Sequence, residues 1–152
     1  MTMPTPSRDL DLRVYYEDTD FSGRVYHASY LRFMERGRTE WLRALGFEHG
    51  ALAGEQGVAF AVRSLAIEFF APAVIDDLLR VETRMTAIRG AAIEFSQLIL
   101  RRGERIAEAR VRVVALKNGR AARIPRELRA RLDALVEVAP VGSSRYFGPY
   151  RK

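Results

Sequence analysis

The sequence predicts an α+β domain in which one long helix packs on one face of a mostly antiparallel sheet of about five strands. Apolar residues recur at helical spacing from about residue 28 to residue 45, and later segments alternate apolar and polar residues with a period of two. The connections at 89–91 and 101–104 are too short for the crossover helices of a parallel sheet, which need about a dozen residues. A helix layer on a sheet layer is therefore the expected architecture.

The long helix is predicted from about Ala28 to Leu45, and Gly46 is placed to end it. One face is apolar, while arginine and glutamate occupy the opposite face. Gly37 lies on or beside the apolar face, where glycine costs roughly 1 kcal/mol relative to alanine, so we expect a close approach to another backbone there. The side chains expected to be buried are Tyr30, Leu31, Met34, Trp41, Leu42 and Leu45.

Strands are predicted both before and after this helix in the sequence. A short strand is expected over residues 12–16, followed by a turn at 18–23. After the helix, the alternation changes phase between Val62 and Leu65, which predicts a bulge near Arg63 and Ser64. Further strands are expected around 79–87, 93–99 and 107–113, with a terminal helix over 125–136. Because a single sheet leaves exposed edges, we expect at least a dimer.

The chain of 152 residues, 48% of them hydrophobic, is long enough for one compact domain with a single core. We assign residues 1–10 to a flexible lead-in, residues 11–138 to the domain and residues 139–152 to a C-terminal tail. No internal repeat or linker divides the chain.

Composition narrows the classes of function. The chain has no cysteine, which excludes disulfides and cysteine zinc sites, and its two histidines, His27 and His49, argue against a histidine-rich metal site. The first residues lack the apolar core of a signal peptide, and no apolar run reaches the ~18 residues of a membrane span, so a cytoplasmic protein is expected. The net charge of +6 permits a polyanionic ligand, although a solvated surface is the simpler explanation for each arginine.

The loop before the long helix contains the side chains best suited to catalysis: Glu17, Asp18, Asp20, Tyr26 and His27. The helix start lacks a Ser, Thr, Asp or Asn as N-cap, so some of its first amides are expected to be free. Free amides at the positive end of a helix dipole suit an oxyanion, and Asp20 could act beside them as a base or nucleophile in acyl transfer. The structural alternative treats the two aspartates as turn formers and Tyr26 and His27 as boundary residues.

The sequence VYYEDTDFSGRVYHASYLRFMERGRTEWL, together with FAVRSLAIEFFAPAVIDDLLRVETRM and the IRG turn, closely resembles a known family. It is similar to the Tol–Pal-associated acyl-CoA thioesterases, the YbgC group of the 4-hydroxybenzoyl-CoA thioesterase-like hotdog families. The resemblance covers roughly residues 14–116. It implies a hotdog fold, in which a five-stranded antiparallel sheet wraps around a long central helix, and a homodimer or homotetramer with its site between subunits.

The resemblance also implies roles for particular residues. Asp20 matches the catalytic aspartate of the family, and Tyr16 and His27 match its companion tyrosine and histidine, with the His27 amide at the position that polarises the thioester carbonyl. The expected reaction is hydrolysis of an acyl-CoA to a free acid and coenzyme A. No metal or cofactor is expected, because coenzyme A is part of the substrate. Arg89 beside Gly90, and then Arg63, are our candidates to hold its phosphates.

Other functions remain open from sequence. Within the fold, the alternatives are a hydroxyacyl-thioester dehydratase and a non-catalytic acyl-binding protein. A nucleic-acid-binding module is disfavoured, because the arginines are dispersed among acids and the aromatic residues form no stacking platform. A functional link to the cell envelope is implied only by the family, and the acyl chain length cannot be read from the sequence.

Overall fold

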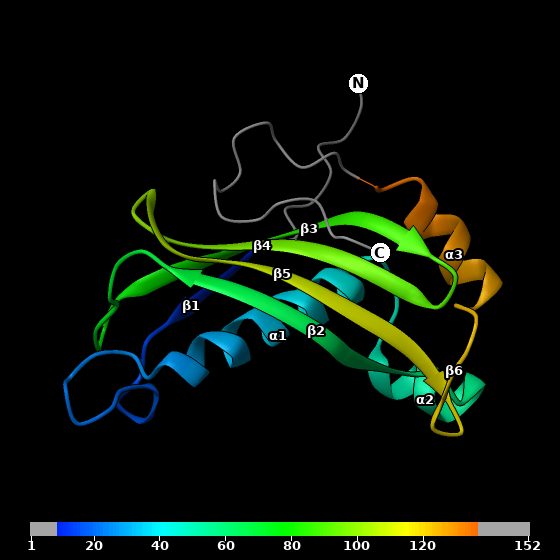
Figure 1. Cartoon of the computed structure of the whole chain (residues 1–152), viewed down its shortest axis with the longest axis horizontal. Coiled ribbons are helices and arrows are strands. Elements are labelled where there is room, and N and C mark those ends of the chain that lie inside the picture. The colour runs from blue at the N-terminus through cyan, green and yellow to red at the C-terminus, as the bar shows by residue number, and fades with distance from the viewer. Residues whose placement is uncertain (1–8, 137–152) are drawn as a thin grey trace.

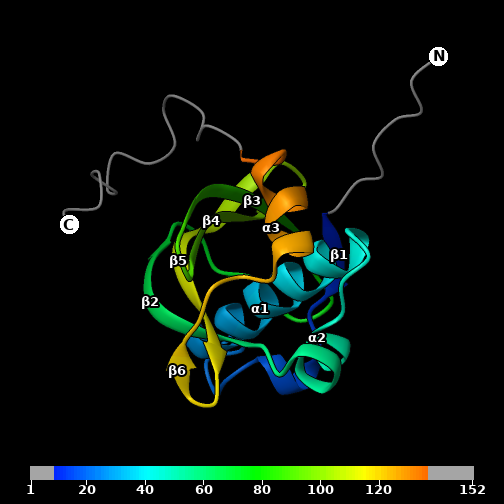
Figure 2. The same cartoon turned by 90° about the vertical axis from the view of Figure 1, so that its right-hand side faces the viewer.

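A computed structural model describes residues 9–136 of the chain. Within them, one antiparallel sheet curves over a long helix, α1, which crosses its concave face (Figures 1 and 2). The strands, in the spatial order β1-β3-β4-β5-β2 with β6 beside β5, are β1 Leu10–Arg13, β2 Ala59–Phe69, β3 Leu78–Arg89, β4 Ala92–Arg101, β5 Glu104–Lys117 and β6 Arg120–Ala121. The helices are α1 His27–Ala44, α2 His49–Gln56 and α3 Arg126–Asp133, with a 3₁₀ turn, η1, at Tyr16–Asp18. The predicted hotdog architecture is confirmed.

The five predicted strands are present and antiparallel, and the structure adds the two-residue strand β6 and changes the bounds of the first strand. The predicted bulge is present, because the register of β2 against β5 shifts between Val62 and Ser64. The first strand, however, begins at Leu10 and ends at Arg13, so Tyr16 lies in η1 and not in a strand. The proposed tail, residues 139–152, and most of the proposed lead-in lie outside the described residues.

The buried face of α1 packs against the inner face of the sheet. Tyr30, Met34, Trp41 and Leu42 are buried as predicted. Leu31 was expected inside but is exposed, whereas Phe33 is almost fully buried. The difference arises because the curved sheet covers a wider stripe of the helix than the sequence predicted. Near the start of α1 this stripe is also shifted by one residue from its predicted position.

Gly37 lies where α1 comes closest to the sheet. A Cβ atom built there would be 2.7 Å from Val81 Cγ1 and 3.0 Å from Thr83 Oγ1. Beneath it, Gln97 is fully buried and donates from Nε2 to the Met34 carbonyl and to Thr83 Oγ1, each at 2.9 Å. The approach predicted from sequence is thus confirmed, although its partners are side chains of β3 and β4 rather than a backbone.

The segment after α1 contains a helix that the sequence did not predict. Gly46, with a φ of +90°, follows α1 as expected, and α2 then runs over His49–Gln56. Its glycine-rich sequence, HGALAGEQ, has weak helical periodicity, and Leu52 is its one buried residue. Further along, α3 buries Leu128 and Leu132 and contacts the end of α1, where Arg131 Nη1 donates to the Leu45 carbonyl at 2.6 Å.

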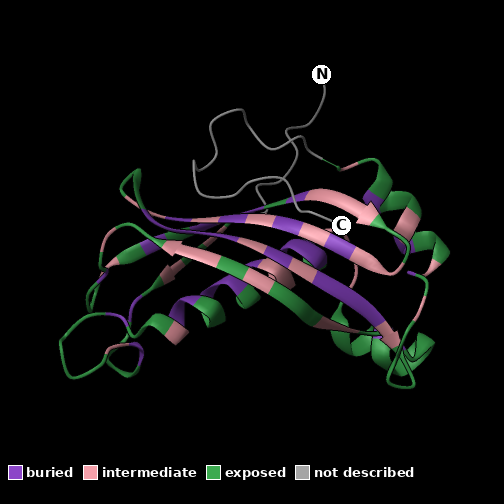
Figure 3. Ribbon diagram, in the orientation of Figure 1, coloured by how far each residue is buried: buried purple, intermediate pink, exposed green. Residues whose placement is uncertain are grey.

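Strand β2 forms one edge of the sheet. It is 11 residues long and pairs only with β5 among the strands of residues 9–136. None of its residues is fully buried, in contrast to β4 and β5 beside it (Figure 3). A long edge strand with free backbone donors and acceptors is an available surface for pairing with another strand.

Candidate active site

The loop between β1 and α1 is folded back on itself by backbone contacts. The buried carboxylate of Asp18 accepts a hydrogen bond from the Tyr15 amide at 2.8 Å, and the Asp18 carbonyl accepts one from the Tyr26 amide at 2.9 Å. A bridge between Thr19 and Val25 closes the loop. These contacts bring Asp20 close to the first residue of α1, and they give Asp18 a structural role.

Asp20 lies at the exposed tip of this loop. Its Oδ1 accepts hydrogen bonds from the Ser22 hydroxyl at 2.5 Å and from the Ser22 amide at 2.8 Å. These two bonds, with smaller contributions from His27 and Arg24, lower the pKa of Asp20. The carboxylate is therefore ionised at neutral pH, as a nucleophile or an attacking base must be.

The start of α1 has free backbone donors, as predicted from the missing N-cap. Tyr26 occupies the N-cap position, and no side chain in the described part of the chain caps the helix. The amides of His27 and Ala28 have no acceptor within residues 9–136. Two free amides at the positive end of an 18-residue helix form a suitable site for a developing oxyanion.

His27 and Tyr16, the residues expected to assist Asp20, differ in their position relative to it. His27 is exposed, its charge acts on Asp20, and its ring lies 4.4 Å from that of Tyr26, measured between centroids. Tyr16 is 82% exposed, and its hydroxyl makes no hydrogen bond to any described residue. The structure thus brings Asp20, His27 and the helix amides together, but it does not bring the Tyr16 side chain into contact with them.

The candidate phosphate ligands lie elsewhere in the chain. Arg63 is exposed at the bulge of the edge strand β2. Arg89 is the last residue of β3 and Gly90 follows it; the other end of β3, at Leu78, is near the Asp20 loop, because the Val14 amide donates to the Asp77 carbonyl there. Eleven residues of strand separate Leu78 from Arg89, a distance of about 36 Å at the usual rise. Within one chain, the Asp20 loop and Arg89 are therefore at opposite ends of the sheet.

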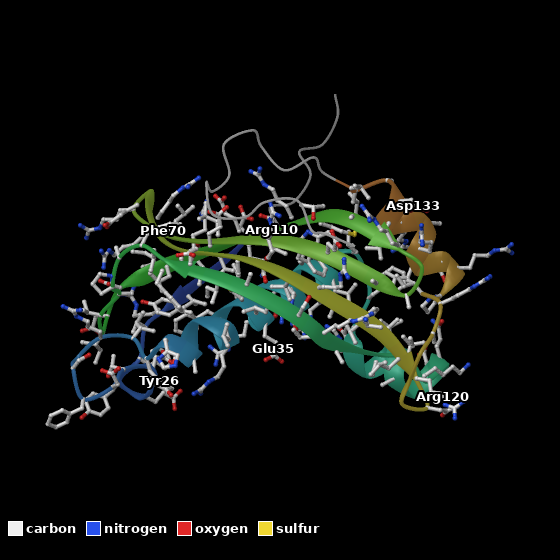
Figure 4. All side chains as sticks on the ribbon, in the orientation of Figure 1. Tyr26, Glu35, Phe70, Arg110, Arg120 and Asp133 are labelled. Carbon is white, nitrogen blue, oxygen red and sulfur yellow. The ribbon has the colours of Figure 1, made fainter. Side chains whose placement is uncertain are left out.

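A cavity of about 580 Å³ opens between α1 and the strands beyond it. Its wall carries the polar side chains of Glu35, Arg38, Thr39 and His49 among apolar ones: Trp41, Leu42, Phe60, Val62, Ile93, Phe95 and Val113. Figure 4 shows Glu35 farther along α1 than Tyr26, on the side facing away from the sheet. None of Asp20, His27 and Tyr16 lines this cavity. Arg38 is 11 residues after His27, which corresponds to about 16 Å along the helix axis.

Two further residues lie in this region. His49, interpreted from sequence as structural or exposed, is exposed overall, and its ring lies in the cavity wall 5.9 Å from that of Phe60. Burial lowers the pKa of His49, so its imidazole is largely neutral at pH 7. Ser29 is buried near the start of α1, and its hydroxyl has no hydrogen-bond partner among residues 9–136. Nothing in the sequence pattern marks either position, because both depend on what the sheet places opposite them.

The described residues contain no cluster of three or more His, Cys, Asp or Glu side chains that could hold a metal ion. No helix in residues 9–136 is both long and apolar enough to cross a membrane.

Comparison with known proteins agrees with this fold. A family profile described as the thioesterase-like superfamily matches residues 14–132. The acyl-CoA thioesterase YbgC of Haemophilus influenzae is 46% identical over 121 residues, which cover 78% of this chain and 89% of that protein. The acyl-CoA thioester hydrolase YbgC of Escherichia coli O157:H7 is 52% identical over 89 residues, which cover 59% of this chain and 66% of that protein.

A crystal structure of a probable thioesterase from Bartonella henselae superposes with a TM-score of 0.75 at 44% identity, covering 77% of this chain and 98% of that one. Together, the curled sheet around α1 and these matches define a thioester hydrolase of the hotdog fold, as the sequence predicted. The chain belongs to the thioesterase-like superfamily.

Proposed function

We propose that the protein hydrolyses an acyl-CoA thioester to a carboxylic acid and coenzyme A, with Asp20 as the catalytic base or nucleophile. The observation that carries the proposal is the position of an ionised, exposed carboxylate beside two free amides at the start of α1, in a chain of the thioesterase-like superfamily. The names of the H. influenzae and E. coli relatives support an acyl-CoA substrate.

The chemistry follows from the groups at this site. The thioester carbonyl oxygen accepts hydrogen bonds from the His27 and Ala28 amides, which stabilise the negative charge that forms on it. Asp20 either removes a proton from water, whose oxygen then attacks the carbonyl carbon, or attacks that carbon itself to form an anhydride that water hydrolyses. The carbon–sulfur bond breaks and the thiolate of coenzyme A leaves, taking up a proton. His27 orients the carboxylate, the water or the thiolate, with no metal or cofactor, whereas a role for Tyr16, whose side chain contacts none of these groups in one chain, stays a prediction from the family resemblance.

The complete site requires a second copy of the chain, paired through β2. Two β2 strands related by a two-fold axis pair antiparallel, so the Phe60 end of one lies beside the Phe69 end of the other. The Phe69 end is next to the start of α1, since the rings of Tyr30 and Phe69 are 5.4 Å apart. The Phe60 end carries the cavity. Pairing therefore puts Asp20 of one protomer near the cavity of the other, which explains why the two lie apart in one chain.

The same pairing gives a role to the basic residues at the far end of the sheet. Arg89 and Gly90, distant from Asp20 in their own chain, approach the Asp20 loop of the second protomer, and Arg63 lies near the middle of the paired strands. Guanidinium groups bind phosphate with two parallel hydrogen bonds. We propose that Arg89, and secondarily Arg63, contact the phosphates of coenzyme A from across the dimer. A tetramer, a cytoplasmic location and a link to the cell envelope stay predictions from the sequence and its family resemblance.

The test is a panel of acyl-CoA substrates, from short aliphatic to long-chain and aromatic, assayed by thiol release with wild type and Asp20→Asn. We expect turnover to fall by about 10³-fold or more in the variant, because an amide can neither attack nor accept the proton. Near wild-type turnover would exclude Asp20 from catalysis. Enoyl product without thiol release would identify a dehydratase, and saturable acyl-CoA binding without either product would identify an acyl-binding protein.

A further inference from the structure

The cavity beside α1 contains charged side chains that the Asp20 chemistry does not use. Its walls are mainly aromatic and aliphatic, but Arg38 and His49 interrupt them, and Glu35 lies at α1's exposed face. At about 580 Å³ the cavity has the size of a small-ligand site. Under the proposed function, on which this inference rests, it receives the acyl group of the thioester attacked by Asp20 of the second protomer.

Arg38 is held in one orientation at this cavity by a neutral group. Its Nη1 donates to Gln97 Oε1 at 2.9 Å, and Gln97 is itself fixed by its bonds to the Met34 carbonyl and Thr83. A guanidinium has five N–H donors, so most of them remain available. Within residues 9–136, Arg38 forms no ion pair with a carboxylate.

The positive charge of Arg38 is therefore incompletely compensated. Burial lowers the pKa of Arg38, and the charge of Glu35, one turn earlier on α1, opposes that effect only in part. Arginine remains charged in proteins even so, because its reference pKa lies far above neutral pH. A half-buried cation without an anionic partner is costly, and a bound anion offsets that cost.

The neighbouring groups favour an anion attached to an apolar chain. His49 is largely neutral at pH 7 because burial lowers its pKa, so its ring adds no second charge but can donate a hydrogen bond. Thr39 offers a hydroxyl on the same wall. Around them, Phe60, Phe95 and the other apolar lining residues suit methylene groups.

We infer that Arg38 determines acyl specificity by binding a carboxylate at the end of the acyl group distal to the thioester. The substrates selected are then monothioesters of dicarboxylic acids. In this arrangement the methylene groups contact the apolar wall, and the terminal carboxylate accepts hydrogen bonds from the Arg38 guanidinium in the planar geometry that favours this pair.

The test compares thioesters of equal carbon number with and without the terminal carboxylate: succinyl- with butyryl-CoA, glutaryl- with valeryl-CoA, adipoyl- with hexanoyl-CoA and suberoyl- with octanoyl-CoA. The measured quantity is the ratio of kcat/KM within each pair. We expect a ratio above one for at least one chain length in the wild type. Arg38→Gln should lower that ratio about ten-fold or more, whereas Glu35→Gln, which removes the opposing charge, should raise it.

Arg43→Gln is the matched control, because Arg43 lies on the same helix, is exposed, pairs with Glu40 and does not line the cavity. It should leave the ratio unchanged. A wild-type ratio below one at every length, or an equal loss for both members of each pair in Arg38→Gln, would overturn the inference. The equal loss would identify Arg38 as a structural link between α1 and β4, or as a contact between protomers.

Binding separates a failure of this inference from a failure of the proposed function. Titration calorimetry on Asp20→Asn and on Asp20→Asn/Arg38→Gln measures affinity for adipoyl- and hexanoyl-CoA without turnover. Loss of adipoyl-CoA affinity alone in the double variant supports the carboxylate site even if the wild type hydrolyses none of these thioesters. Equal affinities in both proteins refute it even if all of them are hydrolysed.

Discussion

The contact between α1 and the sheet at Gly37 gives the most direct quantitative prediction. In Gly37→Ala, the added Cβ would lie 2.7 Å from Val81 Cγ1, 3.0 Å from Thr83 Oγ1 and 3.1 Å from Gln97 Nε2. All three neighbours are buried, and Gln97 is fixed by hydrogen bonds, so none can move aside without disturbing the core. The helix must shift away from β3 and β4.

The expected cost follows from two opposing effects. Overpacking a well-packed core costs about 1–3 kcal/mol, and three contacts this short place the variant near the upper end. Alanine returns about 1 kcal/mol, because it favours the helix more than glycine does. The net destabilisation is therefore about 2 kcal/mol, equivalent to a fall in Tm of roughly 4–8 °C for a chain of this length.

The assay is urea unfolding followed by circular dichroism at one fixed protein concentration, since association of protomers would shift the midpoint. Gly54→Ala in α2 is the matched control, because a Cβ there meets no atom of the described residues within 4 Å. It should be stabilised by up to about 1 kcal/mol. If Gly37→Ala were as stable as the wild type, or were stabilised as much as Gly54→Ala, the close approach of α1 to the sheet at Gly37 would be refuted.

Three further results are expected. In Ser22→Ala, loss of the hydroxyl that most lowers the Asp20 pKa raises that pKa, so the acidic limb of the kcat/KM profile moves to higher pH; an unchanged limb would contradict Asp20 as the titrating group. Arg101→Gln breaks a partly buried ion pair with Asp77 (2.7 Å) and should cost about 1–3 kcal/mol in the free energy of unfolding at pH 7. Burial alone would raise the Asp77 pKa, but hydrogen bonds from the Val74 amide and Arg101 together lower it. The stabilisation is therefore present above pH 3.8 and is lost as pH falls through the lowered pKa. A difference in unfolding free energy between variant and wild type that stays constant in acid would contradict the pairing. Light scattering should give at least twice the 17.3 kDa chain mass, and a monomer at assay concentrations would refute the paired β2 edge.

Several parts of the fold could be predicted from the sequence because they depend on local patterns. The period of 3.6 over residues 28–45 and the alternation in the strands specify which faces are apolar, and the phase change at Arg63 locates the bulge. The short turns require antiparallel pairing. By contrast, Tyr16 was assigned to a strand, since its apolar neighbours continue the alternation, whereas hydrogen bonds to Asp18 turn the chain into η1.

The candidate site divides in the same way. Asp20, His27 and the missing N-cap are close in sequence, so a loop of a dozen residues is enough to bring them together, and the family resemblance distinguishes Asp20 from Asp18. The burial of Asp18 against the Tyr15 amide gives a physical reason for that distinction. The sequence alone thus determined the helix, the antiparallel strands and the loop that carries the candidate site.

Only the tertiary structure decided where the remaining groups lie. Arg38, Gln97 and His49 come from α1, β4 and α2, and no spacing in the sequence predicts that they meet near one cavity. The same applies to the free edge of β2, whose Phe60 and Val62 line the cavity. Contacts between distant segments depend on how the sheet curves around the helix, and curvature is a property of the packed strands together, not of any one of them.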